Sequence, residues 1–258
     1  MRVATWNVNS LKARLPRVEE WLQYAQPDVL CLQETKLADA DFPAMAFQTL
    51  GYDSAHCGEG RWNGVAILSR VGLDDVVAGF SDQTEDETVE ARLLSATCAG
   101  VRVTTVYVPN GRSVGSEHYD AKLAWLDRVA SHVASTLDPA SPALICGDFN
   151  VAPEDRDLYD PRKFTHSTHV TPAERAAVQR LVDWGFVDVF RRLYDDDRLF
   201  TWWDYRAGDF HNHRGMRIDL LLATAPLADR ATFALVDRFA RKGKSPSDHA
   251  PLFADFDV

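Results

Sequence analysis

The sequence lacks any long apolar run, and this absence excludes a membrane-spanning helix. No hydrophobic segment approaches the roughly 18 consecutive residues that such a helix needs. The first residues, 1–14, contain no apolar core of the kind that a secretory signal requires. Internal repeats and linkers rich in glycine, proline or serine are missing as well. We therefore expect a single domain over residues 1–258 that does not associate with membranes.

Cysteine is scarce, with four in 258 residues. No two of them form a CxxC pair, so their spacing gives no support for a zinc site. Cys31 and Cys146 lie in apolar, strand-like segments, which predicts buried free thiols. Together with the absent signal, these features lead us to expect a cytoplasmic protein.

Positive charge is also in deficit, because 28 Lys and Arg face 38 Asp and Glu, for a net charge of −10. A protein that coats nucleic acid passively is usually basic, so this balance argues against such a role. It does not argue against an enzyme that acts on nucleic acid, because local charge matters more there. Acidic side chains that hold a metal ion also contribute to the negative total.

Short apolar segments alternate with helical ones along the chain. Seven segments rich in aliphatic and β-branched residues predict strands, at 3–7, 29–33, 65–68, 101–108, 144–149, 218–222 and 252–256. Helical spacing of apolar residues predicts helices over 11–22 and 119–133. A capping box from Thr171 to Glu174 predicts a third helix, which ends at Trp184 before Gly185. The pattern favours an α/β domain with two sheets and helices on the outside.

Polar side chains recur at the ends of these strands. They are Asn7, Glu34, Tyr107, Asp148, Asn150, Asp219, Asp248 and His249. Taken singly, an Asn or Asp beside a strand is most often a turn residue. One turn needs one such residue, however, whereas a metal ion needs several oxygen atoms that converge. Their recurrence therefore favours a metal-dependent site.

The residue types at these strand ends predict a particular chemistry. Oxygen donors without cysteine or clustered histidine suit Mg²⁺ or Mn²⁺, and Mg²⁺ uses only one or two carboxylates. His249, if a second carboxylate holds it, can carry positive charge beside a phosphate. Tyr107 and Asn150 can donate hydrogen bonds to a developing oxyanion. These parts together predict metal-assisted hydrolysis of a phosphate ester.

Six sequence blocks resemble, in the same order, the exonuclease III branch of the endonuclease/exonuclease/phosphatase superfamily, the class II apurinic/apyrimidinic (AP) endonucleases. The blocks are TWNVNSLKAR, LCLQETK, YVPNGR, GDFNVAPEDRD, RIDLLLA and SDHAPL, and the resemblance runs from Arg2 to Phe256. It implies a DNase I-like fold, in which a two-sheet α/β sandwich is flanked by helices in four layers. It also implies a divalent-metal-dependent nuclease of DNA repair, and we expect the protein to be a monomer.

The resemblance assigns roles to the residues at the strand ends. Glu34 is similar to the principal metal-binding carboxylate, Asn7 to a residue that supports the metal site, and Asp248 to a second acidic group near the metal. His249 resembles the histidine that contacts the scissile phosphate, and Asp219 the carboxylate that orients this histidine.

Three further residues correspond to groups that act on the phosphate. Asp148 resembles the general base that activates water, and it could instead be the proton donor to the leaving group. Tyr107 and Asn150 resemble phosphate-contacting groups, and Tyr107 is a second candidate for the proton donor.

The segment 199–219 separates the possible substrates, because aromatic and cationic residues are interleaved there. In AP endonucleases the corresponding region lines a pocket for an extruded sugar without a base. The resemblance places Trp202 on one wall and Met216 and Ile218 on the other. We expect Trp203 and Phe200 to belong to the core.

Contacts to the DNA backbone are expected from Asn110, Arg112, Lys122 and the basic stretch 241–244. These residues would form a locally basic groove on an acidic protein.

The expected activity is cleavage of the phosphodiester 5′ to abasic sites in duplex DNA, which leaves a 3′-hydroxyl. Removal of nucleotides in the 3′→5′ direction and of blocking groups at 3′ ends is expected in addition. One alternative is another phosphoesterase of the superfamily, with a small phosphorylated lipid or inositol as substrate. A second is a DNA-binding or scaffold protein on a degenerate fold, against which the presence of Glu34 and His249 argues.

Overall fold

The computed structural model describes residues 1–83 and 90–258, which form two six-stranded sheets packed face to face. The first sheet has the strand order β11-β12-β1-β2-β4-β3. Its strands are β1 (Arg2–Asn7), β2 (Val29–Gln33), β3 (Asp53–Cys57), β4 (Val65–Ser69), β11 (Ala231–Val236) and β12 (Leu252–Phe256). The parallel pairing of β1 with β2 sets Asn7 opposite Gln33, so these two strands end at the same edge.

The second sheet has the order β5-β6-β7-β8-β10-β9. Its strands are β5 (Asp74–Ala78), β6 (Leu93–Cys98), β7 (Val101–Tyr107), β8 (Ala143–Asp148), β9 (Phe186–Asp188) and β10 (Asp219–Thr224). Tyr107 at the end of β7 lies opposite Asp148 at the end of β8. Asp219, which opens the antiparallel strand β10, also lies opposite Asp148. Three polar residues of this sheet therefore meet at one edge.

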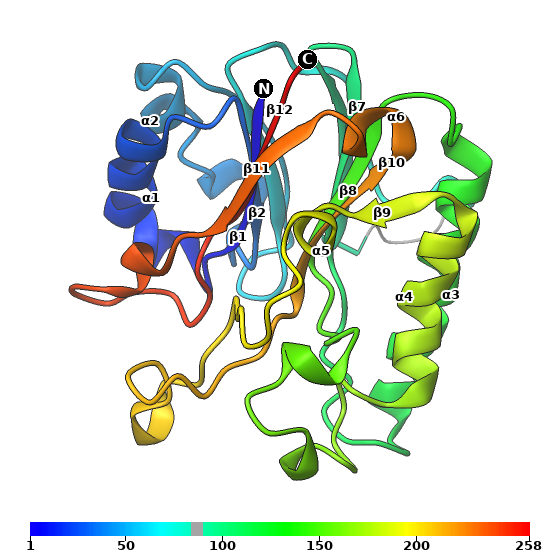
Figure 1. The fold of residues 1–258 in the computed structure, drawn as a ribbon. Helices are drawn as coiled ribbons and strands as arrows, with labels where there is room; N and C mark the ends of the chain where they lie inside the picture. The colour runs from blue at the N-terminus through cyan, green and yellow to red at the C-terminus, as the bar shows by residue number, and fades with distance from the viewer. Residues whose placement is uncertain (84–89) are drawn as a thin grey trace.

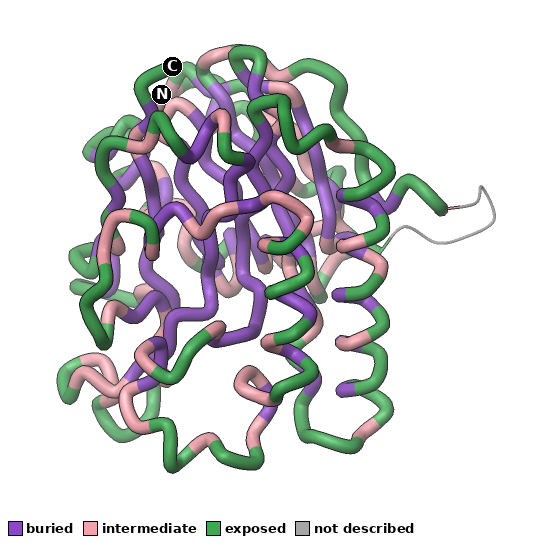
Figure 2. Tube along the Cα trace, turned by 45° about the vertical axis from the view of Figure 1, so that its right-hand side comes forward, coloured by how far each residue is buried: buried purple, intermediate pink, exposed green. Residues whose placement is uncertain are grey.

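Helices cover the outer face of each sheet, which gives four layers (Figure 1). Helices α1 (Leu11–Ala25) and α2 (Ala44–Thr49) lie on the first sheet, and α3 (Glu117–Thr136) and α4 (Pro172–Trp184) lie on the second. The shorter α5 (Val189–Leu193) and α6 (Ala225–Ala228) complete the set, and α5 packs against β11. The buried strands run through the centre of the molecule in Figure 2.

The apolar core is divided into layers by the two sheets. Cys31, Leu144, Cys146 and Leu252 belong to the central layer, which takes residues from both sheets. All four cysteines are buried and free, as the sequence predicts for Cys31 and Cys146. No helix in the described part of the chain is both long enough and apolar enough to cross a membrane.

The fold confirms the predicted α/β class, and each of the seven predicted strands is present. The capping box is also present, with Thr171 accepting from the backbone N–H of Glu174 and Pro172 in the first turn of α4. The sequence analysis did not predict β6 or the four edge strands β3, β5, β9 and β11. An edge strand has one neighbour and a partly exposed surface, so its apolar pattern is weak, as in β5, where all five residues are exposed.

Candidate active site

The predicted strand-end residues of both sheets lie at one end of the sandwich. Asn7 and Glu34 come from the first sheet, and Tyr107 and Asp148 come from the second. The backbone is unusual there, because Glu34 (φ 54°) and Asn150 (φ 50°) both adopt left-handed conformations. Such conformations are costly for residues other than glycine and persist only where the surroundings hold them. Strain of this kind is frequent at functional sites.

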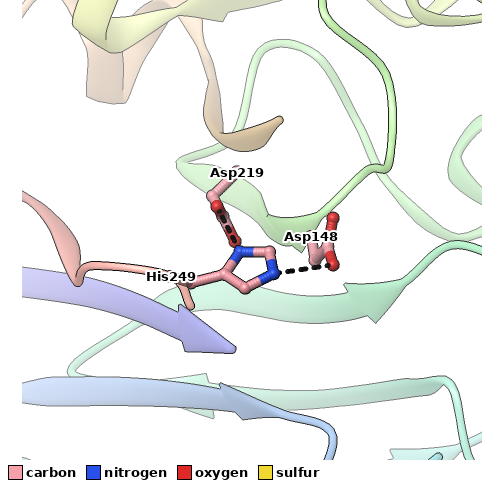
Figure 3. A group of neighbouring side chains, drawn as sticks. All are labelled: Asp148, Asp219 and His249. Carbon is pink, nitrogen blue, oxygen red and sulfur yellow. Dashed lines mark hydrogen bonds and ion pairs between the residues drawn. The ribbon is translucent and has the colours of Figure 1, made fainter. Parts of the chain in front are cut away.

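His249 lies between two carboxylates, as Figure 3 shows. Its Nδ1 is 2.8 Å from Oδ2 of Asp219, and its Nε2 is 3.7 Å from Oδ2 of Asp148. All three side chains are buried. Burial alone would lower the pKa of His249, but the charges of Asp219 and Asp148 outweigh it and raise the pKa to about 10. The imidazole is therefore a cation at neutral pH, with Nδ1 donating to Asp219.

The Asp148 carboxyl has a pKa raised to about 7. Burial is the main cause, and repulsion from Asp219 and Glu34 adds to it, while the positive charge of His249 opposes the shift. A carboxyl group that titrates near neutral pH can accept or release a proton under physiological conditions. Asp148 is therefore suited to either of the two roles that the sequence analysis left open.

Asn7 connects the two sheets at the site. Its Nδ2 donates to Oε1 of Glu34 at 2.8 Å and to Oδ2 of Asp148 at 2.9 Å. Its Oδ1 accepts from the backbone N–H of Asn9 at 2.9 Å, which fixes the orientation of the amide because a backbone N–H can only donate. Asn7 thus turns its amide nitrogen toward the carboxylates, and its contribution to the metal site is to hold Glu34 and Asp148 in place.

The residues around Glu34 fit a hard divalent cation. Glu34 Oε2 pairs with Nζ of Lys36 at 2.8 Å, and Asp219 Oδ1 is buried without a hydrogen-bond partner. Glu34, Asp148 and Asp219 together outnumber the nearby cations Lys36 and His249. An excess of negative charge and a buried, unsatisfied carboxylate oxygen are the features that a bound Mg²⁺ or Mn²⁺ would stabilise.

Two groups of residues could hold that ion. The side chains of Asp148, Asp219 and His249 present ligand atoms within 4.8 Å of one another. A protonated imidazole has no free lone pair, however, so His249 would have to release a proton before it could act as a ligand. The predicted set of Glu34 and Asp248 retains carboxylate oxygens. Asp248 also accepts hydrogen bonds from Nδ2 of Asn9 and Nε1 of Trp202, each at 3.1 Å.

Tyr107 faces the same carboxylates. Burial raises the pKa of its hydroxyl well above the usual value, and the nearby charges of Glu34 and Asp148 raise it further, whereas Arg92 opposes the shift. The hydroxyl therefore stays protonated and can act as a hydrogen-bond donor. Arg92 stacks on the ring at 4.7 Å and donates to the carbonyl oxygen of Tyr107 at 3.1 Å.

Asn150 contacts Asp148 through both its backbone and its side chain. Its N–H donates to Oδ1 of Asp148 at 2.9 Å, and its Nδ2 lies 3.3 Å from Oδ2. The Nδ2 also donates to the carbonyl oxygen of Val108 at 2.9 Å. Asn110, at the protein surface, donates to Oδ1 of Asn150 at 3.3 Å. Asn150 thus holds Asp148 in place and is itself held by the loop that follows β7.

His169 is a site residue that the sequence analysis missed. Its Nδ1 is 2.5 Å from the carbonyl oxygen of Asn150, so this nitrogen carries the proton and donates. Burial lowers its pKa to about 4, and the charge of Lys122 contributes. A neutral histidine therefore borders the site, near enough to the cationic His249 for its charge to affect the pKa of His169. The sequence held one indication that His169 is ordered, which is its position two residues before the capping box that begins at Thr171.

A second missed group supports the loop that carries Glu34. Thr35 Oγ1 is 2.8 Å from Nε2 of His56, and Nδ1 of His56 is 2.7 Å from Oδ1 of Asp39. Thr35 is fully buried, and a Cβ atom at Gly64 would lie 2.0 Å from its hydroxyl. These contacts fix the backbone that follows Glu34. His56 lies 21 residues from Thr35 in the sequence, which gave no indication that the two meet.

Trp202 is half-buried, with Met216 and Ile218 buried in the cluster behind it. The resemblance gave Trp202 a place on the wall of a sugar pocket, and the structure adds a polar contact, because its Nε1 donates to Asp248. Replacing it by alanine would therefore disturb the predicted metal side of the site. Trp203 is fully buried and Phe200 almost so, which confirms that both belong to the core.

The structure corrects the prediction that Lys122 contacts DNA. Its side chain is fully buried and forms an ion pair with Glu174, so DNA cannot reach it. Arg241 at the start of the basic stretch is also buried and donates to the carbonyl oxygens of Ser247 and Trp203. In both residues the positive charge interacts with buried groups of the protein itself.

Arg112 differs from these two buried cations. It is exposed, and among the described residues no hydrogen bond or ion pair engages its guanidinium group. Its backbone N–H donates to Oδ1 of Asn110 at 3.1 Å, which places it beside the site. Lys242 and Lys244 of the basic stretch are exposed as well.

Known proteins resemble this chain over almost its entire length. The model of the endonuclease/exonuclease/phosphatase family matches residues 4–249. Exodeoxyribonuclease III of Haemophilus influenzae is 35% identical, and the match covers 99% of this chain and 100% of the relative. The exodeoxyribonuclease of Bacillus subtilis is 31% identical, with 98% of each chain covered.

Solved structures give the same result. An AP endonuclease from Archaeoglobus fulgidus has a TM-score of 0.96 and 40% identity, with both chains fully covered. The 3′ phosphatase NExo from Neisseria, bound to a product DNA hairpin, has a TM-score of 0.95 and 38% identity, again over the full length of both chains. The chain described here therefore belongs to the endonuclease/exonuclease/phosphatase family, as a nuclease of the exodeoxyribonuclease III and AP endonuclease type.

Proposed function

We propose that this nuclease cleaves the phosphodiester 5′ to abasic sites in duplex DNA and leaves a 3′-hydroxyl. The same site would remove 3′-terminal nucleotides and blocking groups at 3′ ends. Members of the family depend on divalent metal ions, and for this chain we propose Mg²⁺, with Mn²⁺ as a substitute. We also propose that the protein acts as a monomer in the cytoplasm. Size-exclusion chromatography with light scattering tests the monomeric state. Cell fractionation tests the cytoplasmic location.

The observation that carries the proposal is the buried group of Asp148, Asp219 and His249. It combines an imidazole whose pKa is raised to about 10 with a carboxyl whose pKa is raised to about 7. A fixed cation beside a proton-transfer group of neutral pKa is what phosphodiester hydrolysis requires. A merely structural ion pair would not need a second carboxylate on the other side of His249.

Each residue has a distinct part in the proposed reaction. His249 offers Nε2–H and positive charge to a phosphate oxygen, while Asp219 keeps its ring in place through Nδ1. Asp148 either takes the proton of the attacking water or gives one to the leaving oxygen. Tyr107 is a second possible proton donor. A bound divalent ion supplies further charge stabilisation to the phosphate.

The substrate preference is attributed to Trp202. Its half-buried indole lies between Asp248 and the buried pair of Met216 and Ile218. An extruded deoxyribose could pack against the exposed face of this ring, whereas an attached base would require more room. The names of two similar structures, an AP endonuclease and a 3′ phosphatase, support both internal abasic sites and 3′ ends as substrates.

The experiment compares three substrates in the presence of Mg²⁺, Mn²⁺ or EDTA. They are a duplex with one internal abasic analogue, a nicked duplex with a 3′-phosphate, and a small phosphomonoester. We expect metal-dependent cleavage of the two DNA substrates and little turnover of the third. Turnover of the phosphomonoester alone would contradict the proposal and favour another phosphoesterase of the superfamily.

The metal assignment has its own test. Glu34→Ala should remove most of the metal-dependent turnover, because Mg²⁺ is placed by very few carboxylates. A calorimetric titration of Mg²⁺ checks this assignment without relying on activity. Glu20→Ala, which removes an exposed carboxylate on α1, is the matched control. Wild-type affinity for Mg²⁺ in the Glu34 variant would show that the ion binds elsewhere.

A further inference from the structure

The ammonium group of Lys122 joins two loops of the active site. It lies 2.6 Å from the carbonyl oxygen of Asn150 and 3.3 Å from that of Asn110. These carbonyls belong to the loops that follow β8 and β7. The remaining partners are Oε1 of Glu174 at 2.5 Å and Oγ1 of Thr168 at 3.2 Å. Lys122 itself projects from α3, so one side chain ties a helix to both loops.

Glu174 fixes the position of this ammonium group. Its Oε1 also accepts from the hydroxyl of Thr168 at 2.6 Å and from the backbone N–H of His169 at 2.9 Å. Its Oε2 accepts from the backbone N–H and the hydroxyl of Thr171, at 3.0 and 2.8 Å. The carboxylate is therefore saturated with donors and anchored to the start of α4. Lys122 is thereby fixed between two long helices, and it holds the loops rather than following them.

The backbone of the loops that follow β7 and β8 is fitted closely to the side chain of Lys122. Gly111 has φ 85°, and a Cβ atom there would lie 2.9 Å from Cδ of Lys122. Arg112 and Asn150 adopt left-handed conformations, with φ of 54° and 50°. Strained backbone persists where its surroundings hold it, and Lys122 bonds the carbonyl of one of these residues directly.

The contact with Asn150 extends to a catalytic group. Asn150 binds both carboxylate oxygens of Asp148, through its N–H and its Nδ2. We propose that Lys122 is a positioning residue for the reaction, which holds Asp148 at its working position through Asn150. This inference rests on the proposed function of Asp148. Lys122 does not touch the substrate, because it is fully buried.

A purely stabilising role does not account for the arrangement. Replacing a buried ion pair by apolar side chains of similar volume often leaves stability unchanged or increases it. Such a replacement at Lys122 and Glu174 would fill the space, but the carbonyl oxygens of Asn110 and Asn150 would lose the one donor that joins them and would keep only Thr168 and His169, respectively. The loss should therefore appear in catalysis more than in stability.

The test compares Lys122→Met, which keeps the length of the side chain and removes the donor, with Lys122→Arg, which restores donors. Leu181→Ala is the control, because Leu181 is a buried residue of α4 that packs toward the second sheet and takes no part in the hydrogen bonds of Lys122. All are assayed where circular dichroism shows complete folding, on whichever phosphoester the wild type cleaves fastest. We expect kcat to fall roughly 10–100-fold in Lys122→Met with KM little changed. The arginine variant should recover much of kcat, and the control should keep it.

A double-mutant cycle then tests the route through Asn150. If Lys122 acts through Asn150, Lys122→Met should cost less in an Asn150→Ala background, which removes the Nδ2 contact with Asp148 and keeps the backbone contacts. Fully additive losses, wild-type kcat in Lys122→Met, or an equal loss in Leu181→Ala would each overturn the proposal. Should Lys122→Met fail to fold, Lys122→Met with Glu174→Gln removes both charges together and takes its place.

Hydrogen exchange separates this proposal from the proposed function. The backbone N–H groups of 148–152 should exchange faster in Lys122→Met than in the wild type, and not in Leu181→Ala. A wild type that fails to cleave abasic duplex would refute the substrate assignment alone. Unchanged exchange in these residues would refute the positioning role, whatever the substrate.

Discussion

Two buried groups of charged residues lie at the same end of the molecule, where Asn150 contacts both, and they differ in how completely they are satisfied. In the first, Lys122 and Glu174 carry opposite charges, and Glu174 has hydrogen-bond donors on both oxygens. In the second, His249 faces two carboxylates, Asp148 and Asp219. One oxygen of Asp219 is buried without a partner.

The difference shows which group is available for chemistry. Burial raises the pKa of Glu174, but the charge of Lys122 and several hydrogen bonds outweigh it and lower the pKa to about 2. In Asp148 the neighbouring groups do not offset the effect of burial, so its pKa is raised to about 7. A satisfied pair is locked in one protonation state and serves to position its neighbours. An unsatisfied group can exchange protons near neutral pH, which is the property that catalysis needs.

The largest expected effect comes from the unsatisfied group. His249→Asn should lower kcat by roughly 10²–10⁴-fold, the scale of one fixed charge or proton-transfer group. Asp219→Asn should reproduce part of this loss, because the imidazole loses its orienting partner. The double variant should be no slower than the His249 single variant. Additive losses in pre-steady-state rates would show that the two residues do not act as one unit.

The protonation of His249 can be measured directly by NMR titration of the metal-free protein. The pKa of its imidazole should be about 10 in the wild type. In Asp219→Asn it should fall by roughly 1–3 units, because a neighbouring negative charge is lost. A wild-type pKa near 6.5 would contradict the assignment of a cation at neutral pH.

Acid should lower the stability of the fold through the ion pair of Lys122 and Glu174. The folded-state pKa of Glu174 lies below its ordinary value of 4.5, so its ionised form stabilises the fold above pH 4.5. This contribution, on the order of 3 kcal/mol, is lost as the pH falls toward about 2. Urea unfolding between pH 5 and 2 should therefore show a smaller decrease in stability for Glu174→Gln than for the wild type. Parallel pH profiles would contradict the role of this ion pair.

Trp202 should show a smaller effect that depends on the substrate. Trp202→Phe removes the hydrogen bond to Asp248 and keeps a ring, whereas Trp202→Ala removes both. We expect the alanine variant to lose about 1–3 kcal/mol of transition-state stabilisation on abasic duplex, and the phenylalanine variant to lose less. Values of kcat/KM on abasic duplex and on a 3′-phosphate end give the comparison. Equal losses on all substrates, with a large drop in Tm, would indicate that Trp202 serves the core.

The smallest effect is expected for Arg112, the exposed cation beside the site. Arg112→Ala should weaken DNA binding in a salt-dependent manner and reduce the slope of log K against log salt by about 1. Stability should not change, because no described residue pairs with its side chain. Lys12→Ala, at an exposed position of α1, is the matched control. An unchanged salt slope in Arg112→Ala would show that the guanidinium does not contact a phosphate.

The sequence by itself determined the architecture and the family. Strand periodicity and the capping box at Thr171 depend on neighbouring residues, so the buried strands and the helices could be predicted from local pattern. Glu34, Asp148 and His249 could be recognised because their motifs end or precede such strands, and parallel pairing brings strand ends together. Edge strands such as β5 escaped prediction because they are too exposed for a clear pattern.

Only the tertiary structure decided what each polar side chain does. Lys122 and Arg112 are both basic residues near the same motif, yet one is buried against Glu174 and the other is exposed. His169 and the partners Thr35 and His56 are brought into place by contacts between distant segments. The physical reason is that burial, net local charge and pKa depend on every group within a few ångströms. Those groups are assembled from both sheets and four layers, and no local stretch of sequence contains them.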